Sequence, residues 1–109
     1  MTEKDKKILN KIKSMISPDL KEKIKMLVVF GSRAKGEETE DSDLDILAVV
    51  DEKSKELEQR LDDIMYQVMW DNDFKPIISF KVFSHDKFMK ALQEGYSFYK
   101  RVNSEGVSL

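Results

Sequence analysis

Two short runs decide the fold of this 109-residue chain: Gly31-Ser32-Arg33-Ala34-Lys35-Gly36 and, beyond a short loop, Ser42-Asp43-Leu44-Asp45. Residues 26–30, directly before the first run, are apolar and predict a short buried strand. Gly31 follows that strand at once, where the backbone must turn sharply and let a ligand come close. The second run opens an apolar stretch that predicts another strand over 43–50. The pattern therefore places two polar runs at the ends of two strands.

The first run has the residue types of a phosphate-binding turn. Ser32 offers a hydroxyl and an N–H group, and a helix beginning near it would point its unpaired N–H groups at an anion. Arg33 and Lys35 add positive charge for a polyphosphate. Gly36 is expected to end this helix early. Gly31, Ser32, Arg33 and Lys35 are therefore the candidate nucleotide-binding residues.

The second run supplies two candidate metal ligands. Asp43 and Asp45 are two residues apart on the predicted strand, so both carboxylates project from the same face. Paired hard oxygen ligands suit Mg²⁺, which takes few carboxylates and completes its shell with water and substrate phosphates. Asp43 and Asp45 are therefore the candidate catalytic and metal-binding residues. The opposite face of the strand is apolar and carries Leu44, Ile46, Ala48 and Val50.

Together the two runs resemble the signature of the minimal nucleotidyltransferases of the DNA polymerase β superfamily. The match covers about residues 26–50 motif by motif, and the rest of the chain to about residue 92 fits the expected element order more loosely. The resemblance implies a polymerase-β-type nucleotidyltransferase fold. It also implies that Gly31 and Ser32 hold the triphosphate of ATP, and that Asp43 and Asp45 bind the catalytic Mg²⁺.

The same resemblance implies a partner. Small members of this family are often the antitoxin half of a toxin–antitoxin pair, with a helical HEPN-domain toxin. Some of them transfer AMP from ATP to a tyrosine of that toxin. A chain of this length is too small to enclose a large acceptor, so another subunit or a partner protein is expected to complete the acceptor pocket.

One departure from the family pattern keeps other functions open. Active members usually carry a third carboxylate on a later strand, but residues 76–83 contain no Asp or Glu, and Ile77 or Ser79 takes the expected position. Asp71 and Asp73 lie upstream, in a predicted loop. A missing third carboxylate favours an antitoxin that acts by binding alone. A transferase acting on a small molecule such as an aminoglycoside and a nucleotide-binding regulatory module are the further alternatives.

Composition excludes several classes of function. Charged residues make up 37% of the chain and the formal net charge is −2, which argues against broad, non-specific nucleic-acid binding. Because there is no cysteine, there is no disulfide framework, thiol nucleophile or cysteine-based zinc site. No segment approaches membrane-spanning length. We therefore expect a cytoplasmic protein that does not enter membranes.

The apolar periodicity predicts one α+β domain over residues 1–109. The expected order is helix, strand, short helix, strand, helix, strand, helix, with a small mixed sheet and helices packed mainly on one face. The motif core spans about 26–83, and 95–109 form a C-terminal tail. In that tail Phe98 and Tyr99 either cover the core or form a partner-docking surface, and 107–109 form a frayed end or a short strand. Trp70 is expected to pack.

Overall fold

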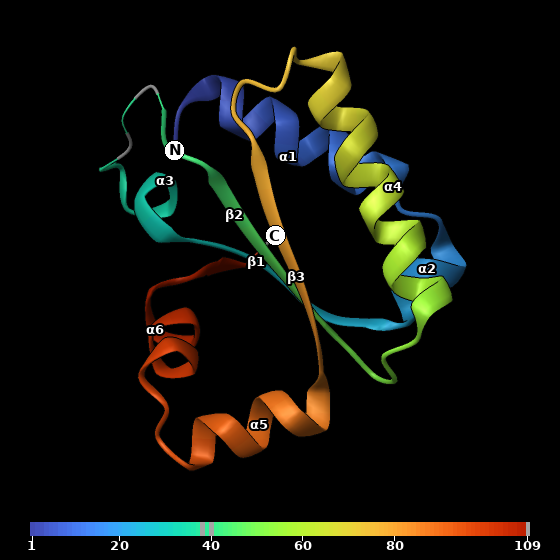
Figure 1. Cartoon of the computed structure of the whole chain (residues 1–109), viewed down its shortest axis with the longest axis vertical. Helices are drawn as coiled ribbons and strands as arrows, with labels where there is room; N and C mark the ends of the chain where they lie inside the picture. Colours follow the sequence, from blue (N-terminus) through green and yellow to red (C-terminus); the bar gives the residue numbers. More distant parts are fainter. Residues whose placement is uncertain (38, 40, 109) are drawn as a thin grey trace.

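The computed structural model describes residues 1–37, 39 and 41–108; Leu109, which the predicted tail includes, lies outside the described residues. Helices precede, separate and follow the strands along this part of the chain (Figure 1). No helix within it has both the length and the apolar character needed to cross a membrane. The elements are α1 (Glu3–Met15), α2 (Pro18–Glu22), β1 (Ile24–Phe30), α3 (Gly31–Lys35), β2 (Leu44–Val50), α4 (Lys55–Asp71), β3 (Ile78–Ser84), α5 (His85–Gln93), α6 (Ser97–Glu105) and β4 (Val107–Ser108).

The strands form a mixed sheet in the order β3-β2-β1-β4. β2 lies between β1, which is antiparallel to it, and β3, which is parallel to it. Of the two alternatives for the end of the tail, a frayed end or a short strand, the structure has the strand, β4. It pairs with β1 through Val28 opposite Ser108 and Val29 opposite Val107. The α+β class and the mixed sheet are therefore confirmed.

Helices cover both faces of β2, unequally. α1 and α4 pack on one face, while α5 and α6 lie across the other (Figure 1). Along β2 the residues alternate between these two layers, with Ile46 in the cluster under α1 and α4, and Leu47 in the cluster under α5 and α6. Phe98 and Tyr99 pack against that second cluster, so the tail does cover the core. The predicted tail is thus a structural layer.

The aromatic end of α4 differs from the prediction. Trp70 is 62% exposed and does not belong to the core. Its ring lies edge-on to Phe74, with 6.1 Å between the ring centroids, and Tyr66 contacts Phe74 in the same manner at 5.7 Å. The α4 positions facing the sheet are instead filled by Leu57, Leu61, Met65 and Val68. Trp70 lies one turn beyond Tyr66 on the solvent side of the helix.

A buried ion pair joins the start of the chain to the motif core. Asp5 is fully buried and Arg33 is 7% exposed. The Arg33 Nη1 lies 3.0 Å from Asp5 Oδ1, and its Nε donates to the Ser42 carbonyl oxygen at 2.8 Å. Asp5 also closes a capping box with Thr2 at the first turn of α1. Through this pair α1 is fixed against α3 and against the segment that leads into β2.

Asp5→Asn should lower the free energy of unfolding by about 3–5 kcal/mol, because it leaves the Arg33 charge buried without its counter-ion. Urea denaturation followed by circular dichroism measures this. The matched control is Glu3→Gln, which removes the exposed Lys6–Glu3 ion pair of the same helix and should change stability by less than about 0.5 kcal/mol. Equal losses for the two variants would contradict a stabilising role for the buried pair.

Candidate active site

The two signature runs meet where β1 ends and β2 begins. Phe30, the last residue of β1, pairs with Asp45, the second residue of β2. Asp43 lies one residue before β2, whose first residue is Leu44. Asp43 is exposed and Asp45 is half-buried, whereas every other residue of β2 is buried. A carboxylate therefore interrupts an otherwise apolar strand next to the turn after β1.

Gly31 is required at that turn for two independent reasons. Its φ is +77°, in the left-handed region that residues with a Cβ rarely adopt. A Cβ atom built on it would also overlap Asp45 Oδ2. The carboxylate of Asp45 thus lies directly against the backbone where α3 starts. The short helix predicted here begins at Gly31 and ends, as predicted, at Gly36, whose φ of +74° forms a left-handed C-cap.

The electrostatics of the site centre on Asp45. Partial burial, followed by the nearby charge of Asp43, raises the pKa of the Asp45 carboxyl above its ordinary value. The ammonium of Lys81, on β3, acts in the opposite direction. The two carboxylates therefore repel one another, and a cation placed between them would relieve that repulsion.

The donor set fits a hard divalent cation. Both carboxylates belong to residues that form no ion pair among the described residues, so their oxygens are available. Within the described part of the chain, no group of three or more histidine or acidic side chains is arranged to hold a metal ion. Asp43 and Asp45 would hold Mg²⁺ as a pair, with water and substrate oxygens completing the shell. Ser79 of β3 pairs with Asp45 of β2. It therefore takes the position of the family's third carboxylate, for which the sequence left Ile77 and Ser79 as candidates.

The predicted phosphate-binding residues divide into two groups. Gly31 and Ser32 form the first turn of α3 beside Asp45, and Lys35 is at its last turn, with its ammonium 3.0 Å from Glu105 of α6. Arg33 points the other way, into the interior, where Asp5 and the Ser42 carbonyl occupy its guanidinium. Arg33 therefore holds the loop in place, and we assign it no contact with phosphate.

The C-terminal helix adds residues that the sequence analysis did not assign to the site. A cavity of about 200 Å³ lies beside Gly31. Phe98 contributes to it and carries the Lys81 ammonium 5.0 Å from its ring centroid. In the sequence, only the concentration of aromatic and basic residues in the tail hinted at a binding role for these residues. The packing of α6 is what brings them to Gly31. The lining consists of Phe30, Gly31, Lys35, Phe98, Arg101, Val102 and Glu105.

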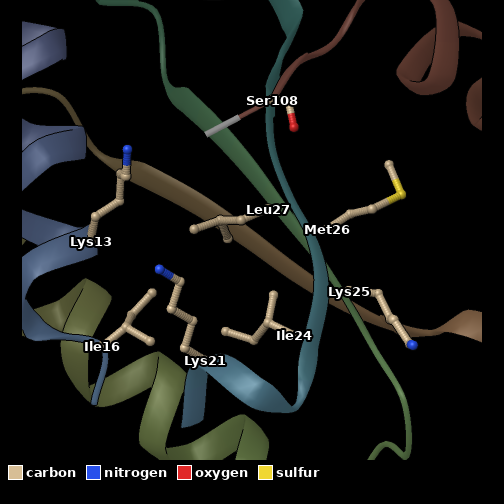
Figure 2. Close-up of a pocket in the computed structure, with 8 residues that line it drawn as sticks. All are labelled: Lys13, Ile16, Lys21, Ile24, Lys25, Met26, Leu27 and Ser108. Atoms are coloured by element: carbon tan, nitrogen blue, oxygen red, sulfur yellow. The ribbon is translucent and has the colours of Figure 1, made fainter. Parts of the chain in front are cut away.

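A second cavity, of about 350 Å³, lies at the other end of β1 (Figure 2). Lys13 of α1 and Lys21 of α2 stand on one side of it, and the side chain of Leu27 extends from β1 toward them (Figure 2). Lys25 points away from these two lysines and pairs with Asp51 at 3.3 Å. None of the signature residues lines this cavity, so it is separate from the acidic pair.

Gly31→Ala should destabilise the protein more than Gly36→Ala does. Both glycines have left-handed φ values, but a Cβ at Gly36 meets no atom within 4 Å, whereas one at Gly31 overlaps Asp45. The Gly36 variant should lose about 1 kcal/mol from backbone strain, and the Gly31 variant about 1–3 kcal/mol more. Urea denaturation of both variants measures the difference. Equal losses would show that Asp45 moves away from Gly31 without cost.

Asp45→Asn should stabilise the metal-free protein at pH 7. The raised pKa means that the folded state disfavours the ionised carboxyl, so this penalty is present above the folded-state pKa and absent below the unfolded-state value, ordinarily 3.8. Urea denaturation at pH 7 should therefore show a gain that disappears near pH 3. Asp86→Asn, an exposed acid on α5, gives the matched change in net charge. A loss of stability at pH 7 would contradict the electrostatic account.

A family model described as a nucleotidyltransferase domain matches residues 6–101, from α1 to α6. The protein named "Putative protein adenylyltransferase MJ1379", from Methanocaldococcus jannaschii, is 45% identical to this chain over 49 residues. That match covers 45% of this chain and 47% of the relative, so it spans about half of the relative's length. The family match takes in both signature runs and, of the α6 residues beside Gly31, Phe98 and Arg101. The chain therefore belongs to the nucleotidyltransferase domain family.

Proposed function

We propose that this protein is a Mg²⁺-dependent adenylyltransferase that transfers AMP from ATP to a hydroxyl group, and that the hydroxyl belongs to a tyrosine of a helical HEPN-type toxin. The observation that carries this proposal is the position of Asp45, whose carboxylate lies against Gly31 with Asp43 one residue outside the strand. A phosphate chain lying along the turn would then be next to both carboxylates.

Each residue of the site has a distinct role in the proposed reaction. Gly31 and Ser32 lie along the triphosphate, and Lys35 adds a positive charge at the far end of α3. Asp43 and Asp45 hold Mg²⁺, which withdraws charge from the phosphate oxygens when it is bound. Arg33 fixes the loop that carries the acidic pair. A bound cation would offset the repulsion between the two carboxylates.

The reaction is an in-line displacement at the α-phosphorus. The acceptor oxygen forms a bond to this phosphorus, and the bond from phosphorus to the bridging oxygen of the β-phosphate breaks. Pyrophosphate leaves with the electron pair of that bond. The proton of the acceptor hydroxyl passes to water, since Asp43 and Asp45 are occupied as ligands and Ser79 stands where a third carboxylate would act as base.

A protein acceptor is favoured over a small molecule. Asp43 is exposed, and the cavity beside Gly31 has only about 200 Å³, which is small for a ligand pocket. A large acceptor must therefore approach from outside and complete the site itself. The name of the relative, a protein adenylyltransferase, supports the same choice over an aminoglycoside. Such a reaction belongs in the cytoplasm, where ATP and Mg²⁺ are supplied.

A second function is an antitoxin that neutralises its partner by binding, without transfer. The specific observation in its favour is the register of β3, which places the hydroxyl of Ser79 opposite Asp45. A site without a third carboxylate retains the means to bind a nucleotide and loses a candidate general base. The two functions differ in whether the acidic pair is needed to protect against the toxin.

The variant with both Asp43→Asn and Asp45→Asn should lose AMP transfer and keep its affinity for the partner. Removing two anionic ligands eliminates the cation site, and transfer should fall by a factor of at least about 10³. Intact-mass measurement after incubation with ATP, Mg²⁺ and the product of the adjacent gene detects each added AMP. The matched control carries Asp62→Asn and Asp63→Asn, two exposed acids of α4.

The outcomes separate the two functions. Transfer that is lost only in the Asp43/Asp45 variant supports the adenylyltransferase. A stable complex that receives no AMP from the wild-type protein would leave the binding antitoxin as the function. Transfer at the wild-type rate in the Asp43/Asp45 variant would show that the metal site was assigned to the wrong residues.

A further inference from the structure

The strand beside the acidic pair presents a lysine instead of a third acid. β3 runs parallel to β2 in a register that pairs Asp45 with Ser79 and Leu47 with Lys81. Paired residues of neighbouring strands lie on the same face of a sheet, so Ser79 and Lys81 share the face of Asp45. Phe83, the next residue on this face, packs into the core under α5 and α6, which confirms the alternation along β3.

Lys81 is an exposed residue whose ammonium is positioned by an aromatic side chain of α6. Its Nζ lies 5.0 Å from the centroid of the Phe98 ring, a cation–π contact with α6. Phe98 in turn lies edge-on to Phe30, the last residue before Gly31, with 5.6 Å between the ring centroids. The same ammonium lowers the pKa of Asp45 against the effect of burial. The Lys81 ammonium is therefore close both to Asp45 and to Phe98, which lines the cavity beside Gly31.

The net charge of the cluster formed by Asp43, Asp45, Ser79 and Lys81 limits how many divalent cations it can bind. Two carboxylates and one ammonium leave a single net negative charge, and the neutral Ser79 adds none. A site that clamps two divalent cations needs several anionic ligands to offset their mutual repulsion. A cluster of one net negative charge is suited to one divalent cation. An ammonium beside that cation is suited to the phosphate oxygens that the cation does not reach.

We propose that Lys81 binds the polyphosphate of the nucleotide directly, in the position where a second metal ion would otherwise act, so that the site holds one divalent cation. This inference rests on the proposed function only in taking a nucleoside triphosphate as the ligand. The proposal adds a phosphate-binding residue on β3, outside both signature runs. It also gives Phe98 the role of positioning the Lys81 ammonium.

Nucleotide affinity tests the role of Lys81. Calorimetric titration with a non-hydrolysable α,β-methylene analogue of ATP and Mg²⁺ should show at least tenfold weaker binding for Lys81→Met. Lys81→Arg should restore most of the affinity, because it keeps the positive charge. The matched control is Lys90→Met, which removes the same charge from an exposed lysine of α5 and should bind as the wild type does. Equal affinities for Lys81→Met and Lys90→Met would overturn the proposal.

The number of metal ions provides the second test. Electron paramagnetic resonance titration with Mn²⁺ and the same analogue should count one bound ion per wild-type chain. Ser79→Asp adds a carboxylate opposite Asp45 and should raise this number to two, whereas Ser79→Asn, of the same size but neutral, should leave it at one. Two ions bound to the wild-type protein would overturn the proposal. Thermal melting of each variant confirms that it is folded.

These results are distinguishable from a failure of the proposed function. If the analogue binds through Lys81 but no AMP reaches any acceptor, the transferase is refuted and the role of Lys81 stands. If AMP is transferred and Lys81→Met binds the analogue normally, the role of Lys81 is refuted and the transferase stands. A wild-type protein that binds no analogue refutes both.

Discussion

The close approach of Asp45 to Gly31 is the constraint on which the site depends. The residue that follows β1 must adopt a left-handed conformation and must also leave room for a carboxylate at its Cα. Glycine alone meets both conditions without strain. Once β1 and β2 are paired through Phe30 and Asp45, the acid is held at the start of α3. The backbone turn and the acidic side chain therefore form one unit, built by two strands.

The rest of the sheet accommodates Asp45, a carboxylate in an otherwise apolar strand. β2 is buried on both faces, and a half-buried carboxylate within it is disfavoured by desolvation and by its acidic neighbour. Around it the structure provides offsetting contacts. The Asp5–Arg33 pair anchors the loop before β2 to α1, and Lys81 brings a positive charge from β3. In the proposed function, a bound cation would offset the remaining repulsion between the two acids.

The helices after β3 cover the sheet face that carries Asp45 differently from the way α1 and α4 cover the opposite face. α1 and α4 cover one face of the sheet with apolar side chains, whereas α5 and α6 cover only part of the face that carries Asp45. α6 then returns to β1 through β4, which brings Phe98 and Glu105 beside Gly31. The C-terminal tail thus stabilises the sheet and lines the site at once. The arrangement leaves Asp43 exposed.

The sequence by itself determined most of the elements and the acidic pair, because these follow from local chemistry, but it did not predict α6 within the tail. A nearly continuous apolar run defines β2, and the glycines at 31 and 36 delimit a short helix, as the structure confirms. The inward direction of Arg33 was decided only by the tertiary structure, since its partner Asp5 is remote in sequence. The exposure of Trp70 and the position of Lys81 beside Asp45 have the same origin. Packing across elements and the register of parallel strands depend on long-range contacts, which no local pattern encodes.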